Sequence, residues 1–265
     1  MTAPTDPLPG QLPSYAFGDT AVASRRLDVL ARVFGPTSRA LLRDLPEASR
    51  RVVLDLGCGP GHTTAMLASN FGDAEIIGLD ASAAFVEEAK ATATARCRYH
   101  RADVTRTPLP GAPADVIYSR FLLVHLSDPH AALALWSGQL RPPVLVVEEP
   151  ESIETDDEDF ARYLELAAIV VGARGGDLYA GRILVDAAPP FTEVVRYRRT
   201  PLDVPAGLAA TVFSLNLATW ADDSTVAAVS DRPERSRLAE RLARRGTDPA
   251  TGAIRWWMGQ LVLGH

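Results

Sequence analysis

A turn of alternating glycines beside an aspartate is the segment of this chain whose residue types and spacing best suit chemistry. Gly57, Gly59 and Gly61 follow the apolar run 52–56, in which Asp55 is the one charged residue. Glycine lets the backbone adopt positive φ and lie directly against a ligand. A carboxylate beside the turn would repel a phosphate and attract a cation. The segment therefore predicts a site for an organic ligand that carries a positive charge.

Two further aspartates follow predicted strands in the same manner. Asp80 comes after residues 75–79, and Asp103 comes after residues 98–102. A carboxylate in the position of Asp80 can accept hydrogen bonds from both hydroxyls of a ribose, as it does in dinucleotide-binding folds. Each acid taken alone could equally cap a helix or satisfy the amides of a loop. Their joint placement favours a nucleoside site.

The elements that must position these acids are short strands separated by helical stretches. Strands are predicted at 52–56, 75–79, 98–102, 115–119 and 144–148. Repeated β-α-β units of this kind build a parallel sheet whose carboxyl edge holds the ligand. Residues 191–202 and 253–264 alternate apolar and polar residues as two further strands would.

The run Leu54-Asp55-Leu56-Gly57-Cys58-Gly59-Pro60-Gly61 resembles the glycine motif of class I S-adenosylmethionine-dependent methyltransferases. The resemblance implies a Rossmann-like α/β fold with seven strands, mostly parallel, the last one antiparallel. It also implies S-adenosylmethionine as cofactor and S-adenosylhomocysteine as product. A dinucleotide-dependent dehydrogenase is the alternative that the glycine spacing and Asp55 oppose. The cofactor contacts that the resemblance implies come from Tyr15, Arg26, Asp55, Gly57, Gly59, Asp80, Ala81, Asp103, Val104 and Arg120.

The regions around this core are expected to cover the ligand. Residues 1–45 are interpreted as a tail and a helical lid, which Gly35-Pro36 should break into two helices. Residues 46–150 form the cofactor-binding core. Residues 151–187 are interpreted as a helical insertion that caps a substrate pocket, and residues 188–265 as the strands and helices that complete the sheet.

The chemistry implied by the resemblance is in-line methyl transfer to an oxygen, nitrogen or carbon nucleophile. Positioning can supply much of the rate, so a base is needed only where the nucleophile must lose a proton early. His125 and Glu149, on loops at the predicted carboxyl edge, are the candidate catalytic residues. A histidine that starts a helix and an acid that fixes a loop are the structural alternatives.

Composition narrows the class of protein. The 265 residues are 47% hydrophobic and 23% charged with a net charge of −6, which disfavours a protein that grips nucleic acid through its phosphates. Neither a run of eighteen apolar residues nor a signal-peptide pattern at the start of this sequence is found, so we expect a cytoplasmic protein without a membrane partner. Two cysteines and no Cys/His cluster predict no structural metal.

These features predict a small-molecule methyltransferase, with specialised bacterial metabolism as the expected setting. The alternatives are a methyltransferase-like protein that binds the cofactor for a non-methylating role, such as a cyclase, and an RNA methyltransferase. The sequence leaves the oligomeric state open.

Overall fold

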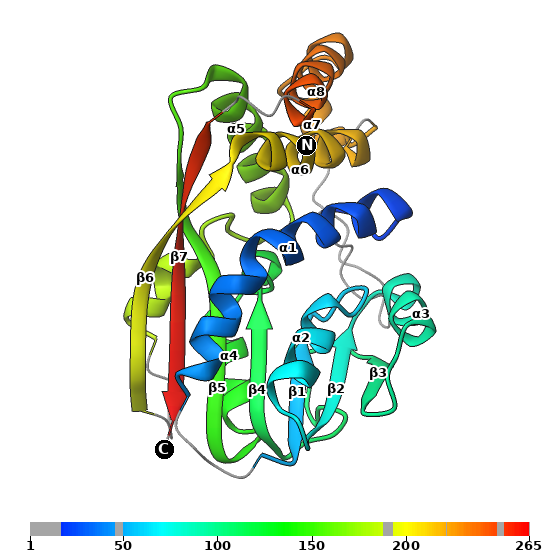
Figure 1. Cartoon of the computed structure of the whole chain (residues 1–265). Coiled ribbons are helices and arrows are strands. Elements are labelled where there is room, and N and C mark those ends of the chain that lie inside the picture. The colour runs from blue at the N-terminus through cyan, green and yellow to red at the C-terminus, as the bar shows by residue number, and fades with distance from the viewer. Residues whose placement is uncertain (1–16, 46–49, 188–192, 221, 248–251, 265) are drawn as a thin grey trace, which may run out of the picture.

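A seven-stranded sheet forms the centre of the computed structural model, which describes residues 17–45, 50–187, 193–220, 222–247 and 252–264 (Figure 1). The strands are β1 (Val52–Leu56), β2 (Glu75–Asp80), β3 (Cys97–Arg101), β4 (Ala114–Arg120), β5 (Leu140–Glu154), β6 (Glu193–Pro205) and β7 (Ala253–Gly264). Their order is β3-β2-β1-β4-β5-β7-β6. β1 to β5 run parallel, and β7 lies antiparallel between β5 and β6. The predicted fold class is confirmed.

Helices cover both faces of the sheet because the strands alternate buried side chains between two apolar layers. Val53 and Ile76 pack under α1 (Ala21–Arg43), α2 (His62–Asn70) and α3 (Ala83–Ala91). Leu54 and Ile77 pack on the other face against α4 (Pro129–Ser137) and the 3₁₀ helix η2 (Ala180–Val185). With both faces covered, β1 reads as an almost continuous apolar run.

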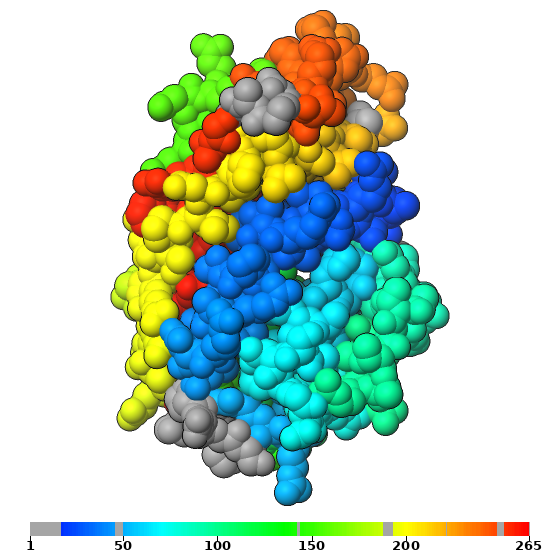
Figure 2. Space-filling view, viewed as in Figure 1, coloured from blue at the N-terminus to red at the C-terminus, as the bar shows by residue number. Residues whose placement is uncertain are grey.

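A helical cap lies beyond the carboxyl ends of the parallel strands, where β5, β6 and β7 continue past them (Figure 1). It contains α5 (Glu158–Ala173), α6 (Ala206–Thr219), α7 (Ser224–Ala227) and α8 (Arg232–Gly246). Phe213, Trp220 and Trp256 form the centre of its own apolar core, which also takes in Phe34 of α1. Figure 2 shows α1, in blue, lying across the boundary between this cap and the sheet.

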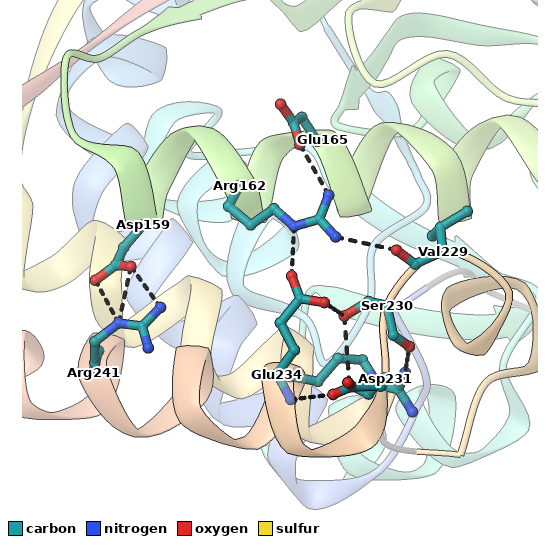
Figure 3. Close-up of polar contacts among 9 residues, drawn as sticks. Asp159, Arg162, Glu165, Val229, Ser230, Asp231, Glu234 and Arg241 are labelled. Atoms are coloured by element: carbon teal, nitrogen blue, oxygen red, sulfur yellow. Dashed lines mark hydrogen bonds and ion pairs between the residues drawn. The ribbon is translucent and has the colours of Figure 1, made fainter.

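Ion pairs hold α8 against α5 within the cap (Figure 3). Arg162 donates to Glu234 at 2.8 Å and to the carbonyl oxygen of Val229 at 3.1 Å. Arg241 pairs with Asp159, with 2.8 Å between nitrogen and oxygen. These side chains are between 19% and 44% exposed, so solvent screens the charges and each pair stabilises the fold by roughly 0–1 kcal/mol. Burial of the aromatic residues therefore contributes more to the cap than its charges do.

The prediction that Gly35-Pro36 breaks the N-terminal region into two helices is wrong. α1 is one helix of 23 residues with Pro36 inside it. A proline inside a helix costs about 3 kcal/mol. Here packing along the whole helix outweighs that cost, because Phe34, Leu41 and Leu42 are all buried.

The region after the fifth strand also differs from the prediction. The predicted strand ends at residue 148, but β5 continues to Glu154. Its second half is held by pairing with β7 as far as Arg255. Asp157 then caps α5 by accepting hydrogen bonds from the amides of Asp159 and Phe160. The stretch after Asp177 forms only a 3₁₀ turn, Ala180–Val185.

Candidate functional site

The glycine turn after β1 has the backbone geometry that its sequence predicts. Gly57, Gly59 and Gly61 have φ of 66°, 53° and 94°. The amides of Gly57 and Cys58 donate to the carbonyl oxygen of Leu79 in β2, at 2.8 and 3.1 Å. A Cβ on Gly61 would lie 2.8 Å from the Tyr99 hydroxyl. The turn therefore has no room for a side chain at this position, and its backbone lies bare at the sheet edge.

Asp80 joins the glycine turn to the loop after β2. Its carboxylate accepts from the amide of Gly59 and from the amide of Ser82, both at 2.8 Å. Burial raises the pKa of this carboxyl, and these amide hydrogen bonds oppose the shift. Each oxygen has a lone pair left after these bonds, and the side chain lines a cavity. Asp80 can therefore accept hydrogen bonds from a ligand.

Asp55 lies beneath the turn and does not line the cavity. Its side chain is 1% exposed and accepts from the hydroxyls of Thr63 and Thr64, both at 2.6 Å. Burial raises its pKa to about 6, against the effect of these hydrogen bonds and of Arg120. In this structure Asp55 ties the first turn of α2 to β1, so it acts on any ligand through the loop and through its charge.

Asp103 and Val104 follow β3 and both line the cavity. Asp103 accepts from the amide and the hydroxyl of Thr105, at 3.0 and 2.6 Å, and pairs with Arg106. The carbonyl oxygen of Val104 accepts from the indole of Trp136, which fixes the loop from below. The acids of β2 and β3 thus lie on one side of one cavity.

This cavity has a volume of about 600 Å³ and lies along the carboxyl edge of the sheet. Of the predicted cofactor residues, Gly57, Gly59, Asp80, Ala81, Asp103, Val104 and Arg120 line it. Asp55 and Arg26 lie outside its wall, and Tyr15 lies outside the described residues. Arg26 is 3% exposed, with its guanidinium 4.7 Å from the centre of the Phe17 ring.

The cavity wall formed by α1 and by the segment after β4 was not predicted residue by residue. α1 contributes Leu27 and Leu30, and the segment after β4 contributes Phe121, Leu122 and Leu126. The apolar residues of the N-terminal region predicted a helical lid, but their spacing did not indicate which of them would face the ligand. None of residues 151–187 lines the cavity; Gly176 packs instead against the carbonyl of Val124, behind the wall.

The segment after β4 turns at Phe121, which has φ of 57° and is the one non-glycine residue with positive φ in the described part of the chain. Glu149 holds the residues that follow. One oxygen of its carboxyl accepts from the amides of Leu122 and Leu123, both at 2.7 Å. Glu149 is 0% exposed and does not line the cavity, so its contacts are those of a positioning residue.

His125 lines the cavity and packs edge-on against Phe17, with 5.4 Å between ring centres. Burial, together with Arg26 and Arg174, lowers its pKa to about 3. The imidazole is therefore neutral near pH 7 and only weakly basic. A general base works best when its pKa lies near the operating pH, so the structure favours a binding role over proton abstraction.

Two comparisons bear on this geometry. Residues 53–143 match the family model described as methyltransferase domain. Trans-aconitate 2-methyltransferase of Methylobacterium radiotolerans is 36% identical over 144 residues, which are 54% of this chain and 55% of that protein. The sequence resemblance is confirmed. Residues 53–143, which include the glycine turn and Asp80, thus resemble a methyltransferase domain.

Solved structures of methyltransferase-like proteins share the fold. The cyclopropane synthase MmaA2 of Mycobacterium tuberculosis has a TM-score of 0.54 at 18% identity, over 87% of this chain and 84% of that one. Coclaurine N-methyltransferase has a TM-score of 0.52 at 13% identity, over 97% of this chain and 75% of that one. The chain spans about half the length of the curated relative named above.

Two features are absent from the described residues. They contain no group of three or more His, Cys, Asp or Glu side chains arranged to hold a metal ion. Within the same residues, every helix is too short or too polar to span a bilayer.

Proposed function

We propose that this chain is a methyltransferase that uses S-adenosylmethionine and acts on a small molecule. The observation that carries the proposal is the placement of Asp80, Asp103 and the bare glycine turn around one cavity of about 600 Å³. That volume lies within the usual range for a site that holds a small organic ligand.

The residues present fit the cofactor. Asp80 would accept from the ribose hydroxyls with the lone pairs that Gly59 and Ser82 leave open. Asp103 and the backbone at Val104 would hold the adenine, as the family resemblance implies. The cofactor, when bound, supplies an electrophilic methyl group on a sulfonium.

The chain's own contribution is positioning. Leu122 packs against the turn, since a Cβ on Gly57 would lie 3.0 Å from one of its methyl groups. Leu27 and Leu30 of α1 line the cavity with apolar surface. Holding a nucleophile in line with a reactive group accounts for a large part of catalysis in such reactions. His125 and Glu149 remain predicted contributors to catalysis. His125 would act as a neutral side chain that lines the site, and Glu149 would act through the segment after β4 that it holds.

Specialised metabolism, the cytoplasm and the absence of nucleic-acid partners remain predictions from the sequence. A non-methylating role on the same cofactor is the second candidate, because the geometry that holds the cofactor is independent of the fate of its methyl group. The acidic net charge of −6 supports a small-molecule substrate over RNA.

Two measurements test the proposal in order. Calorimetry with S-adenosylhomocysteine and with NAD should show binding of the first compound alone. Incubation with methyl-labelled S-adenosylmethionine and a small-molecule cell extract should then transfer label to an extractable product. Tight binding of NAD or no binding of S-adenosylhomocysteine contradicts the cofactor assignment. Cofactor binding with no labelled product, from extracts of several growth conditions, favours the non-methylating role.

A further inference from the structure

The part of the cavity between α1 and the segment after β4 is apolar, in contrast to the side that carries Asp80. Leu27 and Leu30 line it from α1, and Phe121 and Leu126 line it from the segment after β4. If the adenosine occupies the acidic side, this apolar part remains for the second substrate. The residues that line this part therefore indicate which kind of substrate it can bind.

One arginine, Arg120, lies beside this part of the cavity. Among the described residues that line the cavity, the arginines are Arg101 and Arg120. Arg101 ends β3 and donates to the carbonyl oxygen of Ala81 at 3.0 Å, on the acidic side. Arg120 donates to the Ser38 hydroxyl at 3.0 Å, and its guanidinium lies 5.9 Å from the centre of the Phe121 ring. Its positive charge already acts on Asp55, where burial raises the pKa of the carboxyl and Arg120 opposes that rise. Since His125 is neutral near pH 7, a substrate with several carboxylates would leave buried charge unpaired, which is strongly unfavourable.

Phe121 is a rigid aromatic surface in this apolar part. Its ring packs edge-on against Phe34 with 4.8 Å between ring centres, and against Trp256 at 6.4 Å. Glu149 fixes the backbone that follows through the amides of Leu122 and Leu123. Strained positive φ at a non-glycine residue persists only where its surroundings enforce it, and such residues concentrate at functional sites.

We propose that Phe121 determines substrate specificity, and that the substrate is a flat, uncharged molecule with an aromatic or similarly apolar body that lies against this ring. The inference rests on the proposed function, because it assumes that the cofactor fills the acidic side. It departs from trans-aconitate, the compound in the name of the relative described above, because the one arginine beside Phe121 cannot pair three carboxylates.

The test titrates the protein with 1-naphthol, a neutral flat aromatic alcohol, and separately with trans-aconitate, each with and without saturating S-adenosylhomocysteine. Phe121→Leu removes the ring, and Phe71→Leu is the matched control, because Phe71 is 7% exposed in the core under α2 and does not line the cavity. Stacking against one ring is worth a factor of about 3 to 10 in affinity. If Phe121→Leu does not fold, Leu30→Glu places a charge in the same wall and should weaken 1-naphthol at least threefold.

We expect wild-type protein to bind 1-naphthol at least tenfold more tightly than trans-aconitate. Phe121→Leu should weaken 1-naphthol by about 3- to 10-fold, and Phe71→Leu should leave it within twofold. Tighter binding of trans-aconitate, no binding of 1-naphthol, or equal binding by the wild type and Phe121→Leu overturns the inference. If 1-naphthol binding depends on Phe121 but S-adenosylhomocysteine does not bind, the inference on Phe121 survives and the proposed function fails.

Discussion

Replacing Asp80 by alanine should remove most of the affinity for S-adenosylhomocysteine. The carboxylate has lone pairs for the two ribose hydroxyls beyond the two amide hydrogen bonds that it accepts from Gly59 and Ser82. A hydrogen bond to a charged group contributes roughly 1.5–3 kcal/mol. Two such bonds amount to roughly 3–6 kcal/mol, which corresponds to a loss of roughly 100- to 20,000-fold in affinity.

A matched control must separate loss of ligand contacts from loss of stability. Asp115 accepts from the amides of Arg51 and Val52 at 2.7 and 2.8 Å, much as Asp80 does, but it does not line the cavity. Asp115→Ala should therefore lower the melting temperature by an amount similar to Asp80→Ala. Its affinity for S-adenosylhomocysteine should stay within about twofold of the wild type, because its contacts lie outside the cavity wall.

Isothermal titration calorimetry measures both affinities, and thermal unfolding confirms that each variant is folded under the titration conditions. Asp80→Asn serves as a second variant that keeps the shape of the side chain and loses its charge. A folded Asp80→Ala protein with wild-type affinity would refute the ribose assignment. Equal loss of affinity in the Asp80 and Asp115 variants would show that the effect is structural.

Three further outcomes follow from the geometry. Gly61→Ala should destabilise the protein by at least about 2 kcal/mol, measured by denaturant unfolding, because φ of 94° and the Tyr99 hydroxyl exclude a Cβ; an unchanged midpoint would contradict the geometry of the turn. His125→Ala should leave S-adenosylhomocysteine binding within about threefold, and full turnover on the true substrate would reject a chemical role for His125. Burial raises the pKa of Glu149 from 4.5 to about 8, so between these pH values Glu149 is protonated in the folded protein and ionised in the unfolded protein. Its contribution to the free energy of unfolding therefore falls as the pH rises from 4.5 to 8, by up to about 1.4 kcal/mol per pH unit. Glu149→Gln should flatten this dependence in unfolding measured from pH 5 to 8, and an unaltered slope would show that Glu149 ionises normally.

The strands and the glycine turn could be predicted because their signals are local. The run 52–56 and the glycines after it determine a buried strand and a turn with positive φ through steric and hydrophobic effects that act within a few residues. Parallel pairing then places the loops after β1, β2 and β3 at one edge, so Asp80 and Asp103 share a cavity.

The sequence could not predict effects that depend on packing between distant segments. Pro36 is a strong local signal for a helix end, yet α1 continues because Phe34 and Leu41 are buried on either side of it. Asp55 lies at the predicted place in the chain, but only the fold shows that its carboxylate is turned toward Thr63 and Thr64 and away from the cavity.

Glu149 illustrates why residue type at a sheet edge does not determine a role. Neighbouring residues of a strand point to opposite faces, so Glu148 and Glu149 must have different surroundings. Glu148 accepts from Tyr118 and Gln260 at 2.6 Å each, inside the sheet layer, whereas Glu149 accepts from two amides of the segment after β4. Because that segment contains both the strained Phe121 and the cavity-lining His125, Glu149 can affect the chemistry without contacting a substrate. The carboxyl edge of β5 therefore controls the shape of the site through the segment after β4, which lines the cavity together with α1.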